Sequence, residues 1–235
     1  MSLREAWDFH AEEWIRWVRT PGHDSYEQFH GRQFLELLPE PGHLTVDLGG
    51  GEGRLGRDLE KLGHSVVMFD GSRTLARACA THDHPVTVAV ADAACVPARD
   101  GCADLVVAFM SLQDVDDLVG AIREAARLLR SGGCFCLAIV HPLNSAGRFE
   151  GRNGDAEAPF VIRGSYLSAF RFHDEVERDG LTMTFHSAHR PLGTYSSAIE
   201  AAGLVIEAMR EVTEPEPAGR WSRMPLFLDI RASRR

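Results

Sequence analysis

The sequence predicts a doubly wound, Rossmann-like α/β fold, in which helices cover both faces of one large, mostly parallel sheet. Short apolar segments alternate with amphipathic helical segments from residue 43 to residue 140. The segment CFCLAIV is almost continuously apolar, which is typical of a strand buried on both faces of a parallel sheet. The 235 residues can bury one substantial core. We therefore expect a single domain with additions to its core.

Residues 1–40 are predicted to form two helices ahead of the core. Ser2 and Glu5 have capping-box spacing, which marks a helix start. A stripe with spacings of three and four follows on one helical face: Trp7, His10, Trp14 and Trp17. This stripe fits two roles, a packing face against the main body and an aromatic lid over a ligand. Pro21 and Gly22 end the first helix, and a second runs through FLELLP.

Residues 41–141 form the predicted alternating core. Strands are expected at HLTVDL, HSVVMFD, VTVAVAD, DLVVAFM and CFCLAIV. Helices are expected at RLGRDLEKLG, SRTLARACATH and DVDDLVGAIREAARLLRSGG. Ser72 is placed to cap the second of these helices, and Gly132 and Gly133 to end the third.

Residues 142–190 interrupt this alternation after the fifth strand. FRFHDEVER and LTMTFHS are predicted to form a β-hairpin closed by Asp179-Gly180, with His173 opposite His186. Residues 191–235 then supply a helix at TYSSAIEAAG and two strands, LVIEAMREV and MPLFLDIRA, which can pair antiparallel. We treat residues 142–190 as a substrate-side insertion.

Composition restricts the class of partner. The net charge of −9 argues against a nucleic-acid surface and favours a small molecule. Five cysteines, an odd number within apolar stretches, indicate reduced thiols in a cytoplasmic protein. Neither a signal peptide nor a membrane-spanning segment is recognisable, so no membrane partner is expected. The cysteine and histidine spacings predict no metal site, and either a monomer or a homodimer is compatible with the sequence.

The turn VDLGGGEGRLG has two interpretations. Read from Gly51, GEGRLG matches the dinucleotide fingerprint and predicts an NAD(P)-dependent oxidoreductase. Read from Gly49, GGGEG directly follows a strand that carries Asp47. A carboxylate there repels a pyrophosphate but attracts the ammonium group of S-adenosylmethionine.

Three acids follow three successive predicted strands, on the edge where open α/β sheets bind ligands. Asp47 suits an ammonium group, and Asp70 can accept both ribose hydroxyls in a bidentate pair. Asp92 lies where an adenine amino group would be reached. Gly49 and Gly51 let the backbone approach such a ligand closely.

Residues 43–140 resemble the core of class I S-adenosylmethionine-dependent methyltransferases, in particular the small-molecule group similar to ubiquinone/menaquinone-biosynthesis-type enzymes. VDLGGGEG, FDGS, ADAACVPARDGCADLVVA and LLRSGGCFCLA match the family's segments in order. The resemblance implies a seven-stranded sheet with an antiparallel last strand, and methyl transfer to a small-molecule metabolite. The cofactor residues that it implies are Asp47, Gly49, Gly51, Asp70, Gly71, Asp92, Ala93 and Met110. Gln113 stands where many relatives carry a histidine, and Gly50, where cysteine or threonine is frequent, is expected to be tolerated.

Two histidines are candidates for a catalytic base. His141 follows the fifth predicted strand, and His189 precedes the last helix. The alternatives are a hydrogen bond to the loop for His141 and a helix-entry cap for His189. The motifs do not separate O-, N- and C-methylation, because a base is needed only when the acceptor is protonated. A non-catalytic homologue that binds the cofactor is a further alternative.

Overall fold

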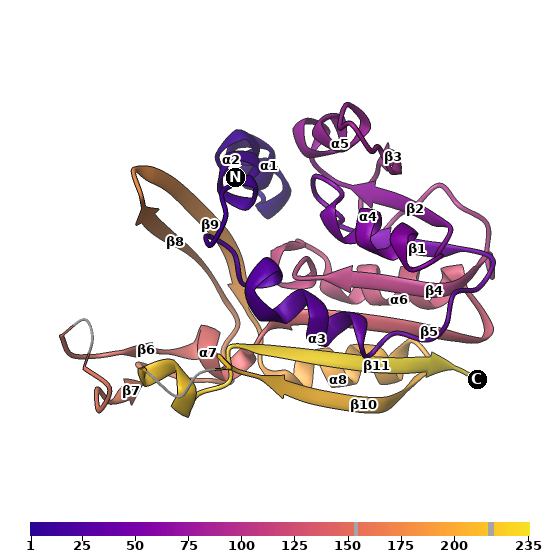
Figure 1. The fold of residues 1–235 in the computed structure, drawn as a ribbon. Helices are drawn as coiled ribbons and strands as arrows, with labels where there is room; N and C mark the ends of the chain where they lie inside the picture. Colours follow the sequence, from indigo (N-terminus) through magenta and orange to yellow (C-terminus); the bar gives the residue numbers. More distant parts are fainter. Residues whose placement is uncertain (153–154, 216–218) are drawn as a thin grey trace.

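A seven-stranded sheet forms the centre of the molecule, in a computed structural model that describes residues 1–152, 155–215 and 219–235 (Figure 1). Its strand order is β10-β11-β5-β4-β1-β2-β3. The strands are β1 (Thr45–Leu48), β2 (Val66–Asp70), β3 (Thr87–Val90), β4 (Ala103–Phe109), β5 (Leu129–Val140), β10 (Leu204–Val212) and β11 (Phe227–Arg234). β11 is antiparallel to both of its neighbours, whereas β1 to β5 pair in parallel. The predicted sheet and its antiparallel last strand are therefore confirmed.

Helices pack on both faces of this sheet, as a doubly wound fold requires. The helical segments are α1 (Leu3–Phe9), α2 (Ala11–Arg19), η1 (Tyr26–His30), α3 (Gly31–Leu35), α4 (Arg54–Lys61), α5 (Arg73–Ala80), η2 (Leu112–Asp114), α6 (Leu118–Leu128), α7 (Pro142–Ala146), α8 (Leu192–Ala201) and η3 (Arg220–Arg223). One buried cluster joins α6 and α8 to the sheet through Ile122 and Ile199. A second cluster, on the other face, joins α3 and α4 through Phe34 and Leu59.

The N-terminal helices differ from the prediction in two respects. The single helix expected after Ser2 is broken at His10 (φ −93°, ψ 9°) into α1 and α2, although the capping box of Ser2 and Glu5 is present. The second helix, expected to run through FLELLP, follows a π-helical turn, η1, and ends already at Leu35.

The helix predicted from Asp114 starts four residues later. Asp117 caps α6 by accepting a hydrogen bond from the Gly120 N–H. Asp114 bonds the Ser187 hydroxyl and Asp116 accepts N–H groups of α1, so tertiary contacts hold both outside the helix. The helix also ends at Leu128, and the chain is already extended from Leu129.

The predicted hairpin is confirmed as β8 (Phe170–Arg178) and β9 (Leu181–His189), which pair His173 with His186. Figure 1 shows it rising from the sheet beside α1 and α2. A short pair, β6 (Arg148–Phe149) and β7 (Phe160–Val161), lies in the same insertion. In the described stretches of the chain, helices that combine the length and the apolarity needed to cross a membrane are absent.

Candidate cofactor site

The carboxyl group of Asp47 lies at the end of β1, fully buried. Neither of its oxygens has a hydrogen-bond partner among the described residues. Burial, with the nearby charge of Asp70, raises the pKa of Asp47 to about 7. An unpaired buried carboxyl group is costly, so it calls for a cationic or hydrogen-bond-donating ligand. An ammonium group satisfies both requirements.

The glycine turn forms a cradle beside this carboxyl group. Gly49 (φ 74°) and Gly51 (φ 62°) adopt left-handed backbone conformations that disfavour other residues. A Cβ atom on Gly49 would lie 2.5 Å from Cβ of Ser111. The turn must therefore pass close to the segment after β4, and only glycine permits this approach.

Gly50 is explained by its neighbour Met68. A Cβ atom on Gly50 would overlap the Met68 side chain and lie 2.6 Å from Oδ2 of Asp47. The thioether occupies the space that a side chain at position 50 would take. This contact explains how the turn accommodates glycine there.

Asp70 and Gly71 lie at the end of β2 and directly after it. The carboxylate of Asp70 accepts the Gly51 N–H at 2.8 Å and the Ser72 N–H at 2.7 Å. Burial nevertheless raises its pKa to about 6. Each oxygen retains a further lone pair, so the group can still accept ribose hydroxyls. At Gly71 an added Cβ would lie 3.3 Å from the Arg4 side chain of α1.

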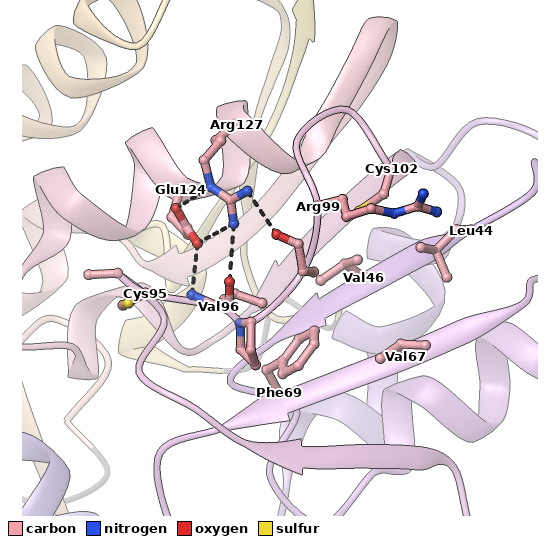
Figure 2. A pocket seen from close by; sticks show the side chains of 13 residues that line it. Leu44, Val46, Val67, Phe69, Cys95, Val96, Arg99, Cys102, Glu124 and Arg127 are labelled. Atoms are coloured by element: carbon pink, nitrogen blue, oxygen red, sulfur yellow. Dashed lines mark hydrogen bonds and ion pairs between the residues drawn. The ribbon is translucent and has the colours of Figure 1, made fainter.

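Asp92 and Ala93 lie on the connection between β3 and β4, which contains no helix among its described residues. Asp92 is exposed and accepts the Ala94 N–H at 2.9 Å. The connection is anchored to α6, because Glu124 accepts the Val96 N–H at 2.7 Å and is paired with Arg127 (Figure 2). A mostly apolar cavity of about 760 Å³ separates the connection from the sheet face.

Met110 lies directly after β4, next to the glycine turn that follows β1. It has a left-handed backbone (φ 54°), and its N–H donates to the Ala138 carbonyl at 2.8 Å. The next residue, Ser111, donates its hydroxyl to the Leu48 carbonyl at 2.7 Å. The segment after β4 is thereby fastened to the end of β1, so Met110 and Gly49 lie at the same edge of the sheet.

The N-terminal helices lie across this edge. Asp8 of α1 accepts the Ser72 hydroxyl at 2.6 Å, and Asp116 accepts the Leu3 N–H at 3.0 Å. The Trp7 indole N–H donates to the His186 carbonyl at 2.9 Å. The indole nitrogen of Trp14 lies 3.7 Å from the position of a Cβ on Gly51. The stripe thus packs on the hairpin, as one of its two predicted roles requires, and Trp14 also lies beside the glycine turn.

The two predicted bases have their ring nitrogens engaged. Nδ1 of His141 accepts the Leu143 N–H at 3.1 Å, and Nε2 lies 3.3 Å from Glu211. Burial lowers the pKa of His141. His189 is fully buried between the Ser145 hydroxyl and the Tyr166 carbonyl, each 2.8 Å away. The alternative role of His189 as a helix cap does not apply, because Pro191 precedes α8.

Asp114 and the pair formed by His30 and Asp229 were not predicted as site residues from the sequence. Asp114 accepts the Ser187 hydroxyl at 2.6 Å, and burial raises its pKa to about 8. His30 and Asp229 form a fully buried pair, 2.8 Å between Nε2 and Oδ1. The contact between His30 and Asp229 could not be predicted, because the two residues are 199 positions apart in the sequence. Asp114 could have been predicted as a site residue, because Gln113 and Asp114 closely follow an apolar strand.

Part of the chain matches a known protein family. Residues 46–137 match the family described as a methyltransferase domain. A ubiquinone/menaquinone biosynthesis C-methyltransferase of Caulobacter vibrioides is 29% identical over 121 residues, which cover 46% of this chain and 48% of the relative. The chain therefore matches about half the length of such curated relatives. A mitochondrial arginine-hydroxylase of Danio rerio is 30% identical over 98 residues, covering 41% of this chain and 30% of that protein.

Solved structures extend the similarity beyond the core. An S-adenosylmethionine-dependent methyltransferase from Mesorhizobium loti is 28% identical, with a TM-score of 0.67. The alignment covers 86% of this chain and 96% of that protein. A [4+2]-cyclase shares the fold at 15% identity, also with a TM-score of 0.67.

Proposed function

We propose that this chain, which carries a class I S-adenosylmethionine-dependent methyltransferase domain, uses it to methylate a small-molecule acceptor. The observation that carries the proposal is the unpartnered carboxyl group of Asp47 beside the glycine cradle, within the described residues. It suits the ammonium end of S-adenosylmethionine and opposes a dinucleotide pyrophosphate.

The cofactor-binding residues follow from their positions. Asp47 would pair with the ammonium group, Gly49 and Gly51 would admit the ligand against the backbone, and Asp70 with Gly71 would hold the ribose. Asp92 and Ala93 would flank the adenine, and Met110 would cover its other side. When bound, S-adenosylmethionine supplies a methyl group activated by its sulfonium sulfur.

Alignment and exclusion of water are the tasks left to the protein in such a transfer. We assign them to the lid of residues 1–40 and the insertion of residues 142–190, which meet where Trp7 bonds the His186 carbonyl. The core of residues 41–141 and the C-terminal segment of residues 191–235 supply the rigid support. The similarity to quinone-biosynthesis enzymes favours a small, partly aromatic acceptor.

Isothermal titration calorimetry with S-adenosylhomocysteine and with NAD⁺ tests the proposal. We expect binding of the first and no binding of the second. Asp70→Ala should weaken S-adenosylhomocysteine binding at least about tenfold, because charge-assisted hydrogen bonds contribute roughly 1.5 to 3 kcal/mol each. Asp83→Ala, an exposed change elsewhere, is the matched control. Binding of NAD⁺ alone would favour the oxidoreductase, and cofactor binding without methylation of any acceptor would favour a non-catalytic homologue.

A further inference from the structure

The pair of His30 and Asp229 lies toward the same edge of the sheet as Asp47. Asp229 on β11 is in register with Ala138 on β5, and Ala138 with Phe109 on β4. Asp47 is in register with Val107, two residues before Phe109 on the same strand. The pair therefore lies two residues further toward the carboxyl edge than Asp47.

The hydrogen bond between the two side chains defines the protonation of the imidazole. A carboxylate accepts, so Nε2 of His30 carries the proton that is donated to Oδ1 of Asp229 at 2.8 Å. Nδ1 then carries a lone pair, and in the described part of the chain it has no hydrogen-bond partner. A carboxylate that orients an imidazole in this way leaves the other nitrogen ready to accept a proton.

The surroundings of His30 are aromatic. Its ring stacks on Phe227 at 4.2 Å with an interplanar angle of 7°, and the Phe109 ring lies 4.8 Å away. His30 also ends the π-helical turn η1, a conformation that is rare and concentrated at functional sites. Flat apolar walls beside a proton-accepting nitrogen suit an aromatic hydroxyl compound.

His30 is closed off from solvent to the same degree as Asp47, both being 0% exposed. The helices α1 and α2, which cover the glycine turn, have to move before any ligand reaches Asp47, and the acceptor can enter in the same movement. Closure afterwards leaves the imidazole in a water-free site, where proton transfer is efficient.

From this geometry we propose that His30, oriented by Asp229, accepts the proton of a phenolic hydroxyl group during methylation. The inference rests on the proposed methyltransferase function. The acceptor oxygen bonds to the methyl carbon as the carbon–sulfur bond breaks, and the electron pair of that bond stays on sulfur. The hydroxyl proton passes to Nδ1 of His30, and the resulting imidazolium is stabilised by Asp229, the positioning residue.

Two phenols of different acidity test the proposal in the full-length protein. At about pH 8, 4-methylphenol keeps its proton, whereas 4-nitrophenol is largely ionised and needs no base. His30→Gln can keep the donation to Asp229 while removing the lone pair of Nδ1. We expect it to slow methylation of 4-methylphenol by about 100-fold or more and that of 4-nitrophenol by less than about tenfold.

Asp229→Asn provides a second readout. Without the carboxylate the imidazolium formed during transfer loses its charged partner, so methylation of 4-methylphenol should slow more than that of 4-nitrophenol. His64→Gln is the matched control, because His64 is also buried but bonds Thr45 at the opposite end of β1. It should leave both rates unchanged.

The outcomes separate the two proposals. Failure to bind S-adenosylhomocysteine rejects the proposed function itself. Cofactor binding without methylation of either phenol, or an equal loss for both phenols in His30→Gln, overturns the role of His30 alone. A nitrogen NMR spectrum of the ligand-free protein with the His30 proton on Nδ1 would overturn it as well.

Discussion

At the scale of a single residue, the ionised carboxyl group of Asp47 lowers the stability of the ligand-free protein, although the proposed binding of the cofactor requires it. Its pKa of about 7, against an ordinary value of 3.8, means that ionisation destabilises the ligand-free fold. At 1.36 kcal/mol per pH unit the penalty reaches up to roughly 4 kcal/mol above neutrality. Asp47→Asn should therefore melt at a higher temperature than the wild type at about pH 8, yet bind S-adenosylhomocysteine at least about tenfold more weakly. Thermal melts and calorimetry measure both, and a lower melting temperature at that pH would contradict the argument.

The side chain of Met68 limits which residues fit at position 50. Gly50→Ala should destabilise the protein by about 1 to 3 kcal/mol, because the new methyl group overlaps the Met68 side chain. Met68→Ala costs stability by itself, since it leaves a cavity in the core. In the double variant the penalty of Gly50→Ala should be smaller, although the new Cβ still lies 2.6 Å from Oδ2 of Asp47, and chemical denaturation in a double-mutant cycle measures the difference. Additive penalties would show that Met68 is not the obstacle.

At the scale of elements, the contact between the N-terminal helices and the hairpin is predicted to be sensitive to pH. His186 stacks on His10 at 5.0 Å, and His173 lies 5.7 Å away on β8. Burial, followed by the charges of these two histidines, lowers the pKa of His186, and Glu13 opposes the shift. A lowered histidine pKa means that folded-state stability is lost as pH falls below about 6.5, the unfolded value. The lid should therefore loosen in mild acid.

Acrylamide quenching of tryptophan fluorescence measures this loosening. In a Trp221→Phe background the signal comes from Trp7, Trp14 and Trp17 of the lid. Quenching should increase as the pH falls from about 7.5 to about 5.5, and His186→Gln should flatten the change. A pH response that persists in His186→Gln would assign it to another group.

The whole molecule should be most stable in mild acid when no ligand is bound. Burial raises the pKa of Asp47 to about 7, of Asp70 to about 6 and of Asp114 to about 8. Each raised value contributes stability that is present below about pH 4 and lost as pH rises through the folded pKa. Below about pH 6.5 the lowered pKa values of His141 and His186 act in the opposite direction.

Thermal melting across pH measures this balance. The melting temperature should fall from about pH 5.5 to about pH 8, and saturating S-adenosylhomocysteine should reduce the fall, because its ammonium group compensates Asp47. A melting temperature that rises over this range would contradict the raised carboxyl pKa values.

Local sequence patterns were sufficient for most of the fold. Three features depend on residues close in sequence: the alternation of strands and helices, the β8–β9 register and the Ser72 cap. They were predictable because hydrophobic periodicity and turn residues indicate them directly. The start of α6 was not predictable, because Asp114 and Asp116 are engaged by β9 and α1. Tertiary hydrogen bonds there outweigh local helix propensity.

By itself the sequence determined the class of fold and the acids at three strand ends, Asp47, Asp70 and Asp92, because strand order along the chain carries such groups to one edge of a parallel sheet. Only the tertiary structure decided which polar groups are left without partners. His30 and Asp229 stand 199 residues apart and meet because β11 inserts beside β5. In a core of low polarity, an unpaired polar side chain is stabilised by binding a proton or a ligand. The local sequence does not show which side chains are buried in this way.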